Sequence, residues 1–353
     1  MSIMSRTFVG GLAAALAAAL ALTGCSSSAA STPSSAPATL TVVTHDSFNV
    51  SPDLLASFEK SSGLKVTYVA PGDAGTLVNQ LVLTKDSPLG DVVYGIDNTF
   101  AGRALSEQVT TPYTSTALPA ADADALKADG SDRLTPIDFG DVCVNADTAW
   151  FSAHHLAVPQ TLEDLTKPEY KDLLVVPNPA SSSPGMAFLT ATVGASGDPG
   201  YLGYWTALKN NGVLIAKDWT ETYSVQFSGS AGKGPRPLAL SYSTSPASEV
   251  VNGAAPTQAL LQTCFRQVEY AGVIAGAKNP EGAKKFIDFM LSQQVQADIP
   301  GQMYMYPALR SATLPADWVS FAPLSPSPYA VPAATITADR DRWIRDWTAT
   351  VVG

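Results

Sequence analysis

The sequence predicts a protein of the α/β class with two domains. One observation supports the class and a second supports the number of domains. Short apolar runs with the composition of buried strands alternate with segments in which apolar residues recur at helical spacing. The part of the chain after residue 39 is long for one hydrophobic core and long enough for two. We therefore expect a parallel, doubly wound sheet flanked by helices, divided between two domains.

The expected strands are short apolar segments. Residues 64–69 alternate between apolar and polar side chains, which is typical of a strand with one buried face. The other segments are nearly continuous apolar runs, which are typical of buried strands of a parallel sheet. In chain order, the expected strands are residues 40–43, 64–69, 91–95, 142–144, 173–176 and 237–240.

The first expected helix carries signals at both ends. Ser51 and Pro52 are typical of an N-cap and a first helical position, and Gly63 is typical of the residue that follows a helix. The remaining helices are expected from the spacing of their apolar residues. They lie around residues 77–81, 162–165 and 186–189, over the whole of 280–297, and around 343–347.

The N-terminus has the pattern of an export signal. Arg6 precedes an apolar run over residues 8–22 that is too short to span a membrane. The run ends in Leu-Thr-Gly-Cys, which resembles a bacterial lipobox and implies cleavage before Cys25 and acylation of its thiol. We expect residues 1–24 to be a lipoprotein signal peptide and residues 25–39 a Ser/Ala/Pro tether. The mature protein would then be anchored to the extracytoplasmic face of the cell membrane, in a periplasm or at the cell surface; a plain secretory signal is the alternative.

The charge of the chain argues against a nucleic-acid partner. The sequence has 21 basic and 31 acidic residues, which gives a formal net charge of −10. Nucleic-acid phosphates require a basic surface. An acidic balance is compatible with a cationic ligand, although acidity also serves solubility alone.

Besides Cys25, the sequence has two cysteines, Cys143 and Cys264. In an exported protein such a pair is more often a disulfide than a metal site. We therefore expect a disulfide between segments that are far apart in the sequence, with two free thiols as the alternative.

Residues 218–246 place aromatic and hydroxyl side chains close together. The segment Asp-Trp-Thr-Glu-Thr-Tyr is followed, after an apolar strand, by Ser-Tyr-Ser-Thr-Ser-Pro. Aromatic faces attract cations by about 0.5–2 kcal/mol per contact, and hydroxyl and backbone N–H groups bind anionic oxygens. Because ligands of α/β proteins collect at the C-terminal ends of strands, we predict a site for a flat, partly cationic small molecule that can carry phosphate. Ordinary core packing of these aromatics is the alternative.

The sequence does not favour an enzyme. It contains no G-x-S-x-G, P-loop, H-E-x-x-H or C-x-x-C motif. His45 and Asp46 are adjacent, so on a strand they would point to opposite faces and could not orient one another for hydrolysis. His154 and His155 are typical of a solvated helix end. We expect no catalytic residue, no cofactor and no bound metal.

Several short motifs occur in a fixed order along the chain. From residue 40 to about 348, in this order and spacing, they resemble the periplasmic thiamine-binding proteins of ABC importers, which belong to the two-lobed solute-binding proteins. The motifs are Thr-His-Asp-Ser-Phe at 44–48, Gly-Ile-Asp-Asn at 95–98, Ile-Asp-Phe-Gly at 137–140, Ser-Ser-Pro-Gly at 182–185, Lys-Asp-Trp-Thr-Glu-Thr-Tyr at 217–223, Leu-Ser-Tyr-Ser-Thr-Ser-Pro at 240–246, Ile-Pro at 299–300 and Met-Tyr-Pro at 305–307.

The resemblance implies a set of ligand contacts. Asp73 and Ala74 match an acidic turn, whose carboxylate would accept from the aminopyrimidine of thiamine or balance the thiazolium charge. Trp219 matches an aromatic wall of the site. The segment that stacks on the ligand and donates hydroxyls is matched by Tyr242, Ser243, Thr244 and Ser245.

Ser182 and Ser183 match the loop that holds the phosphate when a thiamine phosphate is bound. Small residues that precede a helix also form an anion site in general, because backbone N–H groups and the helix dipole face the ligand. Asp97 and Asp46 match positions that serve either as ligand contacts or as caps of strand ends.

The chain departs from the family pattern at three of these positions. His45 stands where a tyrosine is common, Ala74 replaces a glycine, and Tyr304 replaces a tryptophan that stacks on the pyrimidine. A tyrosine keeps a stacking face, whereas a histidine could make binding depend on pH near 6–7, where an unperturbed imidazole titrates. These departures leave open whether the ligand is free thiamine, a thiamine phosphate or a related pyrimidine.

The resemblance also implies a type II periplasmic-binding-protein fold, with the ligand in a cleft between two lobes. Each lobe would be a mixed or parallel sheet flanked by helices. Lobe 1 would comprise residues 40–139 and 271–353, and lobe 2 residues 140–270. A disulfide between Cys143 and Cys264 would then tie two adjacent strands on the lobe 2 side of the hinge. The closed, ligand-bound monomer would dock on the permease of an ABC importer.

Two other functions remain as alternatives. Related two-lobed proteins bind ferric iron through tyrosine pairs, and Tyr304 and Tyr306 would point to the same face if they lay on one strand. A lipid-anchored hydrolase is the alternative from a different class.

Overall fold

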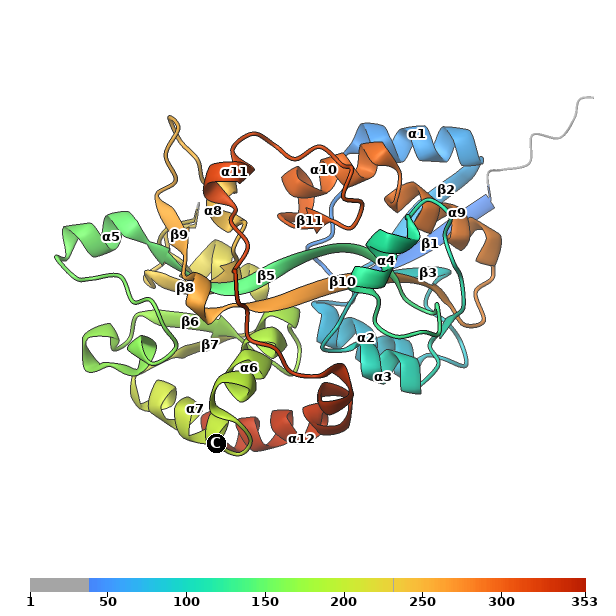
Figure 1. The fold of residues 1–353 in the computed structure, drawn as a ribbon. Helices are drawn as coiled ribbons and strands as arrows, with labels where there is room; N and C mark the ends of the chain where they lie inside the picture. The colour runs from blue at the N-terminus through green and yellow to red at the C-terminus, as the bar shows by residue number, and fades with distance from the viewer. Residues whose placement is uncertain (1–37, 231) are drawn as a thin grey trace, which may run out of the picture. The chain divides into compact units, whose positions relative to one another are not determined.

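The structure, a computed structural model, describes residues 38–353 with the exception of residue 231. The expected signal peptide, Cys25 and residues 25–37 of the expected tether lie outside the described residues. Within the described range the chain builds one mixed sheet flanked by helices, which confirms the expected α/β class (Figure 1).

The sheet has the strand order β2-β1-β3-β10-β5-β8-β6-β7; in addition, β4 pairs with β10, and β9 and β11 pair with β5. Its two outer groups are parallel: β1 pairs with β2 and β3, and β6 pairs with β7 and β8. The strands are β1 (Ala38–Thr44), β2 (Leu64–Val69), β3 (Val92–Asp97), β4 (Thr110–Thr111), β5 (Thr135–Asp147), β6 (Leu174–Pro177), β7 (Leu214–Ala216), β8 (Leu238–Tyr242), β9 (Thr257–Ala259), β10 (Phe265–Ile274) and β11 (Tyr306–Pro307).

The centre of the sheet is antiparallel. β10 runs antiparallel to both β3 and β5, and β5 runs antiparallel to β8, so that β5 and β10 join the two parallel groups (Figure 1). The expectation of a parallel sheet is therefore wrong at the centre. The strand expected at 142–144 is much longer in the structure, where β5 covers Thr135–Asp147. The apolar pattern did not reveal its full length because buried polar residues interrupt it, among them Asp138 and Asp141.

The helices pack around this sheet, and the last one, α12, contacts both α7 and α3. None of the helices in the described part of the chain is long and apolar enough to cross a membrane. The helices are α1 (Pro52–Ser62), α2 (Ala74–Leu83), α3 (Ala101–Ser106), α4 (Ala120–Leu126), α5 (Thr148–Ala153), α6 (Ser183–Ser196), α7 (Gly200–Asn210), α8 (Ser245–Ser248), α9 (Pro280–Met290), α10 (Gln293–Met303), α11 (Trp318–Phe321) and α12 (Ala333–Val351).

The first helix begins and ends as its sequence predicts. Pro52 is its first residue, and Gly63 ends it with a φ of 71°, a left-handed conformation that glycine adopts without strain. Two other helix predictions are wrong. The segment expected at 162–165 forms only a 3₁₀ turn, Asp164–Thr166.

The single helix expected over 280–297 is two helices, α9 and α10. They separate at Ser292, which caps α10 by accepting a hydrogen bond from the N–H of Val295. The apolar pattern continues across the break because both helices pack on the same core.

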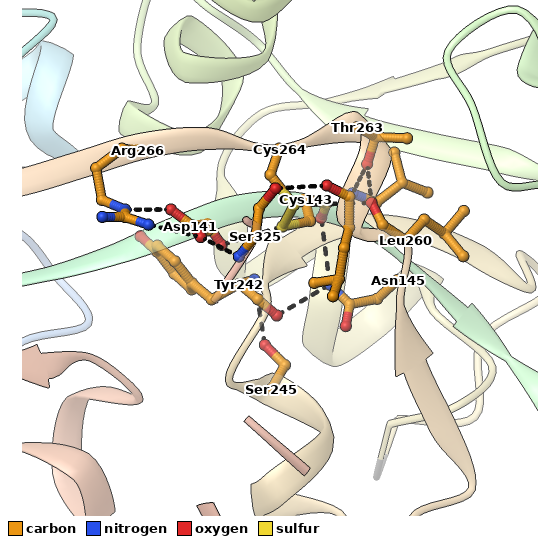
Figure 2. Close-up of a disulfide and its surroundings, with 12 residues drawn as sticks. Asp141, Cys143, Asn145, Tyr242, Ser245, Leu260, Thr263, Cys264, Arg266 and Ser325 are labelled. Carbon is orange, nitrogen blue, oxygen red and sulfur yellow. Dashed lines mark hydrogen bonds and ion pairs between the residues drawn. A yellow bond between two sulfur atoms is a disulfide. The ribbon is translucent and has the colours of Figure 1, made fainter. Parts of the chain in front are cut away.

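Cys143 on β5 and Cys264, the residue that directly precedes β10, form a disulfide. Their Cα atoms are 4.2 Å apart, although 121 residues separate them in the sequence. Figure 2 shows the bond beside Asn145, whose amide donates to the carbonyl of Tyr242 on the adjacent strand β8. The disulfide therefore lies next to the strand that carries the predicted aromatic site. The lobe boundaries expected from the resemblance stay a prediction.

Candidate functional site

A pocket lies where the two parallel groups of strands meet the central pair. Together with its open mouth it encloses about 450 Å³ of space not filled by protein atoms. Three of its sides come from the ends of β1, β8 and α10, and β10 contributes to it as well. The lining residues are His45, Ser47, Asp73, Ser183, Pro184, Trp219, Tyr242, Glu269, Gln302, Met303, Tyr304 and Met305.

His45 follows the last residue of β1 and is buried. Its Nδ1 lies 3.1 Å from the Oγ of Ser47, and its ring packs 5.5 Å from that of Tyr94. Gly95 provides the room for this ring. Gly95 has no partner residue on β10, although its neighbours Tyr94 and Ile96 do, and its φ is 99°. A Cβ at this position would lie 2.3 Å from the His45 ring.

Asp73 occupies the N-cap of α2, where its carboxylate accepts from the N–H of Ala74 at 2.8 Å. Its second oxygen accepts from the backbone N–H of Trp219 at 3.4 Å. Asp46 lies near it, and burial, followed by the charge of Asp73, raises the pKa of the Asp46 carboxyl. This side of the pocket is therefore acidic, and the described lining residues include no lysine or arginine.

Trp219 forms an aromatic wall of the pocket. Its ring stacks on Tyr223 with a centroid distance of 5.5 Å and an interplanar angle of 9°, and its indole N–H donates to the Oγ of Ser241 at 3.0 Å. Tyr242 stands beside it, 6.3 Å away at 50°. Burial, followed by the charge of Glu269, raises the pKa of Tyr242 well above its usual value, so its hydroxyl remains neutral.

Glu269 on β10 brings a buried carboxylate to the pocket, and no local pattern in the sequence marks it. It accepts from the hydroxyl of Tyr94 at 2.9 Å and from the amide of Gln267 at 3.1 Å. The Tyr94 hydroxyl, which has one hydrogen to donate, also lies 2.5 Å from a carboxyl oxygen of Asp138. Burial, followed by the neighbouring charge of Glu269, raises the pKa of Asp138 well above its usual value.

Ser182 and Ser183 lie at the start of α6, as the sequence predicts. The hydroxyl of Ser183 donates to the carboxylate of Asp97, which also accepts from the N–H and the hydroxyl of Thr99. Burial raises the pKa of Asp97 to about 6, although these hydrogen bonds oppose the shift. Asp97 thus lies behind the pocket lining, and its contacts are those of a cap at the end of β3.

The hydroxyl segment after β8 turns mostly inward. Thr244 donates to the carbonyl of Tyr304, and Ser245 exchanges a hydrogen bond of 2.8 Å with Ser241. The Oγ of Ser243 is buried and has no hydrogen-bond partner within the described range. The hydrogen bond from Thr244 holds the backbone of Tyr304, which has a left-handed φ of 56° at the end of α10.

The structure brings half of the predicted ligand-binding residues to the pocket lining. The pocket lining also includes residues that were not predicted to contact the ligand. Three of them, Ser47, Pro184 and Met305, belong to motifs noted in the sequence, and two others, Gln302 and Met303, belong to none. The predicted residues that line the pocket are His45, Asp73, Ser183, Trp219, Tyr242 and Tyr304; those that do not are Ala74, Asp97, Ser182, Ser243, Thr244 and Ser245.

The tyrosine pair considered for iron is not brought together. Tyr304 lines the pocket, but Tyr306 lies on β11 and its hydroxyl donates to the carbonyl of Ala322 at 2.5 Å. Across residues 38–353 apart from 231, no group of three or more His, Cys, Asp or Glu side chains could hold a metal ion. His154 and His155 lie at the exposed end of α5.

In sequence and fold, the chain is similar to known solute-binding proteins. A family model described as bacterial extracellular solute-binding protein matches residues 87–323. The thiamine-binding periplasmic protein of Escherichia coli K12 is 29% identical over 322 residues, which are 88% of this chain and 93% of the relative.

Solved structures of periplasmic binding proteins have the same fold as this chain. The structure of a periplasmic thiamin binding protein has a TM-score of 0.77 and 28% identity, and the match covers 89% of this chain and 96% of the other. A ferric binding protein from Campylobacter jejuni has a TM-score of 0.70 at 16% identity, covering 88% and 99%, and this likeness shows the fold alone. The expected two-lobed α/β fold is thus confirmed.

Proposed function

The chain belongs to the family of bacterial extracellular solute-binding proteins, and from this membership we propose that it captures thiamine, free or phosphorylated, and delivers it to an ABC importer. The names of the relatives over nearly the whole chain support this ligand. The permease of the importer is the proposed protein partner. No nucleic acid takes part, and the protein acts as a monomer.

The observation that carries the proposal is an aromatic wall that faces buried carboxylates. Thiamine joins a cationic thiazolium ring to a flat aminopyrimidine. Trp219 and Tyr242 offer faces on which such rings stack. Asp73 and Glu269 offer negative charge where no lining lysine or arginine competes for it. A phosphate group would extend toward Ser183 at the start of α6.

Ligand capture would involve the two lobes with the boundaries given above, 40–139 with 271–353 and 140–270. The ligand contacts residues from both, such as Asp73 and Trp219, and it therefore selects the closed arrangement. The permease would recognise this closed form.

The mature protein would carry out no catalysis and would be held at the membrane by a lipid on Cys25. The Leu-Thr-Gly-Cys sequence at 22–25 supports the anchor. Metabolic labelling with a radioactive fatty acid tests it: label should enter the protein and disappear in Cys25→Ser. Recovery of unchanged thiamine after prolonged incubation tests the absence of turnover.

A titration of intrinsic tryptophan fluorescence tests the ligand. Thiamine, thiamine monophosphate, thiamine diphosphate and ferric citrate are added separately to the purified full-length protein. We expect saturable quenching by thiamine at micromolar or lower concentration. A folded sample that responds to no thiamine form would overturn the proposal, and a phenolate-to-iron colour with ferric citrate would replace it with the iron alternative.

A further inference from the structure

We propose that His45 and Glu269 act together as the specificity pair of the pocket and read a ring nitrogen that adjoins an exocyclic amino group. This inference rests on the proposed function and deepens it, because the aminopyrimidine of thiamine has such an edge. It assigns the discrimination to two side chains from distant parts of the sequence: His45 directly follows β1, and Glu269 lies in the middle of β10.

Both side chains are buried, and both line the pocket. The Nε2 of His45 lies 3.8 Å from an oxygen of Glu269, too far for a hydrogen bond. This Nε2 has no hydrogen-bond partner in the part of the chain that the structure describes. A buried polar atom without a partner is costly in a folded protein, so its persistence at a pocket wall points to a ligand that satisfies it.

The surroundings fix what each group can offer. The Oγ of Ser47 lies 3.1 Å from the Nδ1 of His45, and either atom can be the donor. The Glu269 carboxylate, 3.8 Å from Nε2, favours a proton on Nε2, so that Ser47 donates to Nδ1 and Nε2 is a donor toward the pocket. Glu269 accepts from Tyr94 and Gln267. A carboxylate has lone pairs for about four hydrogen bonds, so Glu269 keeps acceptor capacity toward the pocket.

A donor beside an acceptor is complementary to one kind of ring edge. The Nε2–H of His45 would donate to the ring nitrogen, and the carboxylate of Glu269 would accept from the adjacent amino group. Oxythiamine has the reverse pattern, because a keto oxygen replaces the amino group and the ring nitrogen carries a hydrogen. The keto oxygen of oxythiamine would face the Glu269 carboxylate, so two acceptors would meet without a hydrogen. A buried site binds such an analogue much more weakly than the ligand with the matching pattern.

The charged groups around the pair do not offer the same pattern. Asp46 and Asp73 lie on the His45 side and add negative charge without a donor. On the Glu269 side, Asp138 and Asp97 lie behind the lining and are engaged by Tyr94 and Ser183. The discrimination therefore depends on His45 and Glu269.

The test is the ratio of the dissociation constants for oxythiamine and thiamine, measured by calorimetry on the full-length protein in detergent. We expect a ratio of at least about 10 in the unmodified protein. The ratio should fall severalfold toward 1 in Glu269→Gln, whose amide can also donate, and in His45→Phe, which keeps a ring but loses the donor. Asp288→Asn is the matched control, since Asp288 also accepts from a tyrosine hydroxyl but lies outside the pocket lining.

The outcomes separate the two proposals. Thiamine that fails to bind the folded protein overturns the proposed function and this pairing with it. Thiamine that binds with a ratio near 1, or with a ratio that both variants leave unchanged, overturns the pairing alone. Circular dichroism checks folding; should Glu269→Gln not fold, the ratio in the unmodified protein and in His45→Phe decides.

Discussion

The carboxylate of Asp73 accepts a hydrogen bond of 3.4 Å from the backbone N–H of Trp219, which lies 146 residues further along the chain. The same carboxylate caps α2 through the N–H of Ala74. Asp73 therefore connects the first parallel group of strands with the aromatic wall, and it brings a negative charge to the pocket lining.

Replacing Asp73 by Asn should separate its charge from its capping role. Asparagine caps helices about as well as aspartate, so the free energy of unfolding should change by less than about 0.5 kcal/mol. Loss of the charge should weaken thiamine binding by about 10- to 150-fold, as expected for a hydrogen bond with a charged group. Asp147→Asn is the control, because Asp147 caps α5 outside the pocket lining. Equal affinities in the two variants would exclude a role for the Asp73 charge.

Trp219→Ala should weaken thiamine binding by about 2- to 30-fold, which corresponds to one cation–π contact. It should also remove most of the fluorescence quenching, because the indole is the fluorophore that lines the pocket. Trp150→Phe serves as the control, since Trp150 stacks on His154 near the exposed end of α5. Quenching that persists in Trp219→Ala and disappears in Trp150→Phe would place the ligand elsewhere.

The elements that could be predicted from the sequence are those with local signals. Pro52 and Gly63 mark the ends of α1, and they do so whatever the rest of the chain does. Ser292 is also a cap signal, but the apolar spacing that continues across it hid the break between α9 and α10. The antiparallel centre of the sheet has no local signal, because it depends on pairing between residues as distant as Asp97 and Glu269.

The same limit applies to the pocket. Trp219 and Tyr242 were predicted as site residues because their own segments combine aromatic and hydroxyl side chains. Glu269 is the single acidic residue of β10, and only the tertiary structure brings it beside His45. The sequence therefore predicts the lining residues that belong to motifs, such as Trp219 and Tyr242, and it does not predict Glu269, which comes from β10.

Gly95→Ala should disturb the pocket through His45. A Cβ at this position would lie 2.3 Å from the His45 ring, and the φ of 99° is unfavourable for any residue with a side chain. We expect a loss of about 1–3 kcal/mol in the free energy of unfolding, together with weaker thiamine binding. Gly130→Ala is the matched control, because a Cβ there meets no atom within 4 Å. Two variants of equal stability would contradict the role given to Gly95.

The double variant Cys143→Ser, Cys264→Ser should unfold more easily. The bond closes a segment with a sequence separation of 121 residues, and removing such a cross-link costs about 2–5 kcal/mol in the chain-entropy account. Urea denaturation measures the loss, which dithiothreitol should reproduce in the unmodified protein. Reduction should also raise its mass by two hydrogens. Thiol labelling of the native, unreduced protein would show instead that the cysteines are free.

The last prediction concerns Asp97 and pH. Burial is the main cause that raises the pKa of Asp97 from 3.8, the ordinary value of an exposed aspartate, to about 6 in the folded protein. Between these two values the folded state holds a proton that the unfolded state has released, so the free energy of unfolding falls as pH rises. Above about pH 6 both states are ionised and the contribution of Asp97 no longer changes.

Asn cannot titrate, so Asp97→Asn should lack this fall. Its stability relative to the unmodified protein should improve by about 1–2 kcal/mol between pH 4.5 and pH 7. Asp164→Asn is the control: its hydrogen bond to Lys167 lowers the pKa of Asp164 to about 2. The carboxyl of Asp164 therefore titrates below this pH window in both the folded and the unfolded protein. The stability of Asp164→Asn relative to the unmodified protein should stay constant across the window. Urea denaturation at the two pH values gives both differences, and a relative stability of Asp97→Asn that does not change with pH would contradict a raised pKa at Asp97.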